Sequence, residues 1–229
     1  RAFEQVRNAV GYPKLNVKVA ATHAGLTVGE DGASHQCIED IALMRALPNM
    51  TVICPCDGLE ANRAIKAAIE YDGPVYIRLG RAAVEDVFDA ETYKFELGKG
   101  VVLKEGSDVT IVATGLLVNE AVEAAKALEA EGISARVVNI HTIKPLDKEL
   151  ICKCAKETGV IVTAEEHSVI GGLGSAVAEA VTECCPVPVV KIGVNDEFGH
   201  SGPAVDLLKE FGLCADNIVA KVKEAVKLK

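Results

Sequence analysis

The sequence predicts an α/β protein of two units, each a parallel β-sheet covered by helices on both faces in three layers. Short apolar runs alternate with segments whose apolar residues recur at helical spacing, which is the pattern of a parallel α/β unit. Hydrophobic residues make up 49% of the 229 residues, whereas aromatic residues make up only 4% and Trp is absent. That composition favours helix-covered parallel strands over an aromatic-rich β-sandwich.

The first unit is expected to begin with the end of a helix that stops before Gly11. Ser34 stands where an N-cap residue would begin the helix that Pro48 ends. Asp57 and Glu60 have the spacing of a capping box at the start of the next helix. Strands are expected at 16–22, 51–54 and 75–79.

Residues 82–107 are expected to link the two units. An acidic stretch from 84 to 91 leads to residues 95–103, which we interpret as a hairpin or an extended arm. The second unit then repeats the alternation of strands and helices, and two helices end the chain. Its strands are expected at 109–113, 135–140, 160–164 and 189–192, and its first helices at 118–131, 147–157 and 172–185.

Charge and hydropathy exclude several classes of protein. The 24 Lys and Arg residues against 33 Asp and Glu residues give a net charge of −9, which is unlike a nucleic-acid-binding scaffold. No apolar run approaches the roughly 20 residues needed to cross a bilayer. We therefore expect a cytoplasmic protein with neither nucleic acid nor membrane as a partner. Because Arg1 falls inside a helical pattern, we expect the start to be a cut or an unobserved boundary.

The cysteine pattern predicts neither a disulfide framework nor a metal site. Eight cysteines are few for a disulfide scaffold of this length, and no pair has the CxxC spacing of a zinc site. We expect these residues to be buried or free thiols.

The chemistry is concentrated in one segment. In parallel α/β sheets, ligands bind beyond the carboxyl ends of the strands. The segment from His23 to His35 follows the first strand and holds two histidines, two acids and three glycines in thirteen residues. Histidine exchanges protons near neutral pH. The alternative is a surface turn with two incidental histidines. Arg81, just after another strand, is either a phosphate-binding residue or a surface ion-pair residue.

Two other patterns are weaker. Gly171 to Gly174 resembles the start of a dinucleotide fingerprint but lacks its closing glycine and its tight turn, so we interpret it as the opening of a helix. Glu165, Glu166 and His167 could form an acid/base cluster, although a polar strand-end loop at a subunit contact is the favoured interpretation. His141 and His200 also follow predicted strands, and no role is assigned to them.

Several stretches resemble transketolases, and specifically the C-terminal subunit of split transketolases, in which the enzyme is made as two chains. The most specific is the run from Ala21 to Gln36. Shorter matching stretches are 45–50, 55–58, 77–81, 111–115, 171–174 and 198–202.

The resemblance implies both a domain division and roles for single residues. Residues 1–90 would be the second part of a pyrimidine-binding domain, with its N-terminal part missing, and residues 91–229 a transketolase C-terminal domain. His23 corresponds to a substrate-phosphate contact and Asp31 to the acid that holds a substrate hydroxyl. His35 corresponds to the catalytic, cofactor-binding histidine beside the reactive carbon of thiamine diphosphate. Arg81 corresponds to the phosphate-binding arginine.

The implied reaction is the transfer of a two-carbon ketol unit from a ketose phosphate to an aldose phosphate, as in the pentose phosphate pathway. The family's cofactor-activating glutamate, its cofactor-stacking aromatic residues and its metal-binding motif are not among these 229 residues. We therefore expect thiamine diphosphate and Mg²⁺ to be bound mainly by residues outside this chain. The expected partner is an N-terminal transketolase subunit or domain, in a hetero-oligomer that includes a homodimer contact, and the chain alone is expected to be inactive.

Two alternatives remain. A 1-deoxy-D-xylulose-5-phosphate synthase uses the same cofactor but typically shows an arginine at the position of His23. A noncatalytic assembly or regulatory module would explain the missing cofactor residues, but it would have no need to keep His23, Asp31, His35 and Arg81 together.

Overall fold

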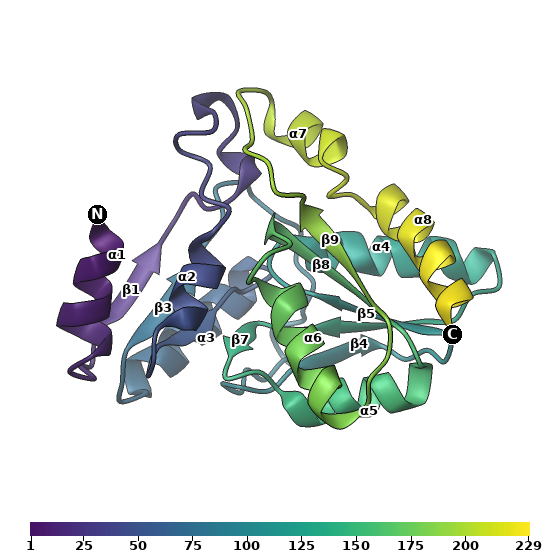
Figure 1. Ribbon diagram of the computed structural model, residues 1–229, viewed down its shortest axis with the longest axis horizontal. Coiled ribbons are helices and arrows are strands. Elements are labelled where there is room, and N and C mark those ends of the chain that lie inside the picture. Colours follow the sequence, from purple (N-terminus) through teal and green to yellow (C-terminus); the bar gives the residue numbers. More distant parts are fainter.

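The computed structural model describes residues 1–229 and contains two β-sheets flanked by helices (Figure 1). The predicted α/β class is confirmed, although each sheet is mixed because one edge strand runs antiparallel to its neighbour. No helix combines the length and the apolar character that crossing a bilayer requires.

The first sheet has the order β1-β3-β2-β7. Its parallel strands are β1 (Lys18–Ala21), β3 (Val75–Arg78) and β2 (Thr51–Ile53), and β7 (Thr142–Lys144) pairs antiparallel with β2. The sequence did not indicate β7, which comes from the second half of the chain. Helix α2 (Asp40–Ala46) packs near Val52, and α3 (Gly58–Glu70) packs on Ile53. Successive strand residues face opposite sides, so the two helices cover opposite faces.

The second sheet has the order β4-β6-β5-β8-β9. Its strands are β4 (Val101–Lys104), β5 (Val109–Ala113), β6 (Ala135–Asn139), β8 (Ile161–Ser168) and β9 (Val189–Val194). All neighbours are parallel except β4 and β6. The interpretation of residues 95–103 as a hairpin or an extended arm is therefore wrong in part. Residues 101–104 form the edge strand β4, which pairs with β6, far along the sequence, and not with a neighbouring hairpin strand.

Helices cover both faces of the second sheet. Val109 and Ile111 point to the core formed with α4 (Leu117–Ala130) and α8 (Ala215–Ala225), whereas Val112 points to the core formed with α5 (Lys148–Thr158) and α6 (Leu173–Cys184). These helices match the predicted ranges closely. The remaining helices are α1 (Ala2–Gln5), the π-helix η1 (Val6–Gly11), the 3₁₀ helices η2 (Leu26–Asp31) and η3 (Val226–Leu228), and α7 (Ala204–Glu210).

The cores of the two sheets are continuous. Leu26 and Ile38 belong to the core of α4 and α8, and residues of α2 belong to the core of α5 and α6. Two apolar clusters thus contain residues of both halves of the chain, and their burial links the halves. The division at about residue 90 stays a prediction.

One helix cap is confirmed and one is wrong. The Asp57 carboxylate accepts a hydrogen bond from the Glu60 N–H at 2.7 Å, which caps α3 as predicted. Ser34 does not cap α2, because α2 begins later, with Glu39 at its N-cap position. The intervening backbone at Cys37 instead forms a parallel bridge with Ala24.

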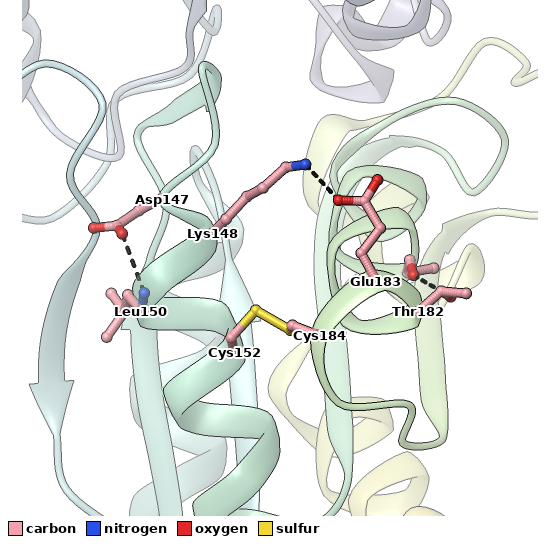
Figure 2. The surroundings of a disulfide bond; sticks show 8 residues. Asp147, Lys148, Leu150, Cys152, Thr182, Glu183 and Cys184 are labelled. Atoms are coloured by element: carbon pink, nitrogen blue, oxygen red, sulfur yellow. Dashed lines mark hydrogen bonds and ion pairs between the residues drawn. A yellow bond between two sulfur atoms is a disulfide. The ribbon is translucent and has the colours of Figure 1, made fainter.

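The expectation that all cysteines are thiols is also wrong. Cys152 of α5 and Cys184 at the end of α6 form a disulfide that joins the two helices, and Figure 2 shows Lys148 reaching Glu183 beside it. The other six cysteines are free. Spacing alone could not indicate this bond, because the two residues meet only when α5 and α6 pack on the same face of the sheet.

Candidate active site

His23 and Arg81 lie at the same edge of the first sheet. Strands β1 and β3 are parallel neighbours with Ala21 paired to Arg78, and both candidates follow directly beyond these strand ends. This is the carboxyl edge, where parallel α/β sheets bind ligands. Thus the neighbouring strands bring a histidine and an arginine that are 58 positions apart in sequence to one edge.

Residues 22–39, here called the site loop, connect β1 to α2. The bridge between Ala24 and Cys37 closes the base of the loop, with the Gly25 N–H donating to the Cys37 carbonyl at 2.8 Å. His23 has a φ of +63°, a left-handed conformation that costs a residue with a β-carbon on the order of 1 kcal/mol. Such conformations persist where surrounding contacts impose them, and they are frequent at functional sites.

The four sequence-predicted residues are exposed, and no hydrogen bond or ion pair joins any two of them. His23 Nδ1 lies 3.0 Å from the Thr22 hydroxyl, and His35 Nδ1 lies 3.0 Å from the Ser34 hydroxyl. Arg81 has only a distant ion pair with Glu30, at 4.0 Å. No hydrogen bond or ion pair within the chain involves the Asp31 side chain. All four groups therefore keep most of their hydrogen-bonding capacity for a ligand or a second chain.

A buried ion pair lies beneath this exposed edge. Arg78 Nε donates to an Asp40 carboxylate oxygen at 2.8 Å, and the Tyr76 hydroxyl donates to the same oxygen at 2.7 Å. Burial alone would raise the pKa of Asp40, but the Arg78 guanidinium and these hydrogen bonds outweigh it and lower the pKa below its usual value. Arg78 also donates through Nη2 to the Glu166 carbonyl at 2.8 Å, which joins the first sheet to β8.

Glu165, Glu166 and His167 are not a polar loop, as the sequence suggested, because β8 continues through them and all three side chains are buried. The Glu165 carboxylate accepts hydrogen bonds from the Leu173 and Gly174 N–H groups at 2.6 and 2.8 Å, at the start of α6. Burial raises the pKa of Glu165 to about 7. Gly171 to Gly174 therefore opens a helix, as predicted.

His167 and Glu166 connect β8 to the first unit. His167 Nε2 accepts a hydrogen bond from the Ala42 N–H at 3.3 Å, and burial lowers the pKa of His167 to about 4. The Glu166 carboxylate accepts from the Thr27 N–H in the site loop at 2.7 Å. In the sequence, Glu165 and Glu166 directly follow the apolar residues of β8. Charges that continue a buried strand indicate partners elsewhere in the fold, because a buried charge requires a partner.

A cavity of about 330 Å³ lies near the site, between the two sheets. Arg78, Gly80, Glu166 and the start of α3 at Gly58 line it. None of His23, Asp31, His35 or Arg81 lines this cavity or the three other main ones. The candidate site is thus an open edge of the chain and not an enclosed pocket.

Comparison with known families gives matches over most of the chain. Residues 1–86 match the family described as transketolase, pyrimidine binding domain. Residues 98–218 match the family described as transketolase, C-terminal domain.

Three relatives and one solved structure are similar over nearly the whole chain. A putative transketolase C-terminal section from Methanocaldococcus jannaschii is 50% identical, over 99% of this chain and 72% of the relative. A 6-deoxy-6-sulfo-D-fructose transketolase subunit from Clostridium sp. is 45% identical, over 100% of this chain and 71% of the relative. A 1-deoxy-D-xylulose-5-phosphate synthase from Heliobacterium modesticaldum is 42% identical, over 98% of this chain but only 35% of the relative. A structure described as a split gene transketolase, inactive beta4 tetramer, is 59% identical with a TM-score of 0.94, over 100% of this chain and 73% of that one.

Proposed function

The chain belongs to the transketolase family, and we propose that, with an N-terminal partner subunit, it forms a thiamine-diphosphate-dependent transketolase. This enzyme would move a two-carbon ketol unit from a ketose phosphate to an aldose phosphate. The observation that supports the proposal most is the exposed edge beyond β1 and β3, where one loop carries two imidazoles and a carboxylate beside an arginine.

In this proposal His23 and Arg81 bind the substrate phosphate. A guanidinium matches the geometry of phosphate oxygens and donates charge-assisted hydrogen bonds to them. The 4.0 Å separation of Arg81 from Glu30 supports this role, because so weak an exposed pair holds the guanidinium only loosely. His23 follows the neighbouring strand and supplies a second donor.

Asp31 and His35 act closer to the reacting carbons. Asp31 accepts a hydrogen bond from a substrate hydroxyl, and its exposed carboxylate has no competing partner in the chain. His35 transfers protons to and from the substrate oxygens whose charge changes during carbon–carbon bond cleavage and formation, as an imidazole near neutral pH can do. Its Nε2 atom has no partner within the chain, so it is available for this role.

Thiamine diphosphate, when bound, supplies the electron sink for the carbon–carbon bond cleavage. The residues of this chain could contact only one side of such a cofactor. His35 lies on an open edge, and it lines none of the four main cavities. We propose that the partner subunit encloses the cofactor and holds its diphosphate and Mg²⁺. We also propose that copies of this chain contact each other in the assembled enzyme.

The proposal is tested with the full-length protein and its partner subunit, with thiamine diphosphate and Mg²⁺ present. Xylulose 5-phosphate with an aldose phosphate acceptor is compared with pyruvate plus glyceraldehyde 3-phosphate, and a sulfonated ketose is included as a third donor. We expect ketol transfer from a ketose, and His35→Ala should reduce turnover by about 100-fold or more.

Each alternative function has its own outcome. Pyruvate consumption would replace the proposal with a 1-deoxy-D-xylulose-5-phosphate synthase. Absence of turnover from every donor would favour a noncatalytic module. In the isolated chain, calorimetry should detect no thiamine diphosphate binding at micromolar concentrations, and tight binding there would overturn the role proposed for the partner.

A further inference from the structure

Two parts of the second unit hold the site loop from different sides. The first is Glu166, whose carboxylate accepts the Thr27 N–H at 2.7 Å. The carboxylate packs against Gly25, which has a φ of +87°, and a β-carbon there would collide with it. Both partners are buried. Replacing the carboxylate with an apolar group would therefore leave a buried N–H without an acceptor, which is destabilising.

The second part is the segment Phe198–Gly202, here called the clamp segment, between β9 and α7. In Figure 1 it lies beside the site loop at the top of the molecule. Gln36 Nε2 donates to the His200 carbonyl at 2.9 Å. A β-carbon at Gly32 in the site loop would collide with the Ser201 side chain, so the two backbones approach closely.

The Gln36 side chain connects the clamp segment to two other points of the site loop, Leu26 and Gly29. Its amide nitrogen lies 3.1 Å from the Gly29 carbonyl and 3.4 Å from the Leu26 carbonyl, in addition to its bond with His200. The side chain is buried. Because carbonyl acceptors surround the two hydrogens of this nitrogen, only a donor suits its place, and an apolar side chain of the same length would lose these hydrogen bonds.

The next residue toward the N-terminus is His35, and nothing else in the chain holds it firmly. Its ring forms one hydrogen bond within the chain, with the hydroxyl of the exposed Ser34. Its backbone N–H donates to the Gly32 carbonyl at 3.0 Å, inside the same loop. The position of His35 therefore depends on how the loop is anchored at Gln36.

We propose that Gln36 is a positioning residue for His35, and that through Gln36 and Glu166 the second unit sets the geometry of the site loop. This inference rests on the proposed function in so far as it concerns turnover. An exposed histidine that transfers protons must be held close to its reactive position, and a displacement of about 1 Å can cost 100-fold in rate. The second unit would then contribute to catalysis without touching the substrate.

The central test is Gln36→Met in the full-length protein assembled with its partner. We expect kcat to fall by about tenfold or more, with a much smaller change in the KM for the ketose phosphate. The phosphate-binding groups His23 and Arg81 lie outside residues 26–36, the part of the loop that Gln36 anchors, and only Asp31 among the proposed substrate contacts lies within it. Glu197→Gln is the matched control, since Glu197 is exposed beside the clamp segment and its side chain forms no hydrogen bond or ion pair within the chain. An unchanged kcat in Gln36→Met would overturn the proposal.

A second measurement does not depend on turnover. Amide hydrogen exchange of residues 26–36 in the same complex should accelerate in Gln36→Met, whereas exchange in β5 and β6 should stay as in the wild type. If the wild-type complex transfers no ketol unit, the proposed function fails, but this exchange result still decides whether Gln36 anchors the loop. Equal exchange in both proteins would overturn the anchoring role.

Glu166 provides an independent pair of variants should Gln36→Met fail to fold. Glu166→Gln keeps an acceptor of the same length for the Thr27 N–H, so kcat and loop exchange should stay within about threefold of the wild type. Glu166→Met removes the acceptor, and it should reproduce the faster exchange of the loop. If the two Glu166 variants behaved alike, the carboxylate would not be the anchor.

Discussion

Arg78 and Asp40 form an ion pair in the interior, with the guanidinium Nε 2.8 Å from a carboxylate oxygen and both side chains about 5% exposed or less. Arg78 ends β3, three residues before Arg81, and Asp40 begins α2 directly after the site loop. The pair therefore connects the two chain segments that border the candidate site. Its burial also makes it sensitive to the loss of either partner.

Asp40→Ala should lower the free energy of unfolding by about 3–5 kcal/mol, because it leaves the Arg78 guanidinium buried without a counter-charge. Denaturant unfolding of the full-length protein measures this effect. Glu183→Ala is the control, since Glu183 and Lys148 form an exposed ion pair that should contribute less than about 1 kcal/mol. Equal effects of the two substitutions would show that burial does not determine the strength of the Arg78–Asp40 pair.

Reduction of the Cys152–Cys184 disulfide should destabilise the protein. The bond closes a loop with a sequence separation of 32 residues, and loss of that constraint on the unfolded chain corresponds to about 3–4 kcal/mol. Guanidinium unfolding with and without reductant measures the change. Cys152→Ser should already unfold at the lower midpoint and should not respond to reductant. A wild-type midpoint that reductant leaves unchanged would contradict the prediction.

Acidification should destabilise the protein through His141 and His167. Burial lowers the pKa of each to about 4, whereas in the unfolded chain they take up protons near pH 6.5. The stability that their neutral forms provide is thus complete above pH 6.5 and is lost as the pH falls toward 4. At pH 5 each histidine would cost on the order of 2 kcal/mol.

The pH prediction is checked by comparing unfolding free energies of the wild type and His141→Phe between pH 7 and pH 5. Glu165 acts in the opposite direction, because its pKa is raised to about 7, but its contribution is common to both proteins and cancels. The substituted ring can keep the contact with the tilted Phe95 ring. The difference between the two proteins should grow in favour of the variant as the pH falls, and a constant difference would refute the shift.

Arg81→Met should impair use of phosphorylated substrates selectively. Loss of a charge-assisted hydrogen bond corresponds to about 1.5–3 kcal/mol, or about 10- to 150-fold in kcat/KM for a ketose phosphate. The same ketose without its phosphate is the internal control, since its kcat/KM should not change. Equal losses on both substrates would show that Arg81 does not bind the substrate phosphate.

Local patterns in the sequence predicted most helices and parallel strands. Apolar spacing indicated α4, α5 and α6 within one or two residues, and the capping residue Asp57 was identified because its partner, Glu60, is three positions away. Strand β7 escaped detection because it has three residues and is stabilised by pairing with β2, about 90 positions earlier. The loop predicted at Glu165, Glu166 and His167 is wrong because charged side chains at the end of β8 have the sequence pattern of a surface loop.

The sequence by itself determined the α/β class, the family and the segment from His23 to His35, because apolar periodicity and a dense chemical motif are properties of nearby residues. Only the tertiary structure decided what supports that segment. Arg78 meets Asp40 across 38 positions, Gln36 meets His200 across 164, and Glu166 meets Thr27 across 139. Whether a polar or charged side chain can be buried depends on partners from distant elements. Arg78 and Asp40 meet when α2 packs on the first sheet, and the other two pairs meet only when the two sheets pack together.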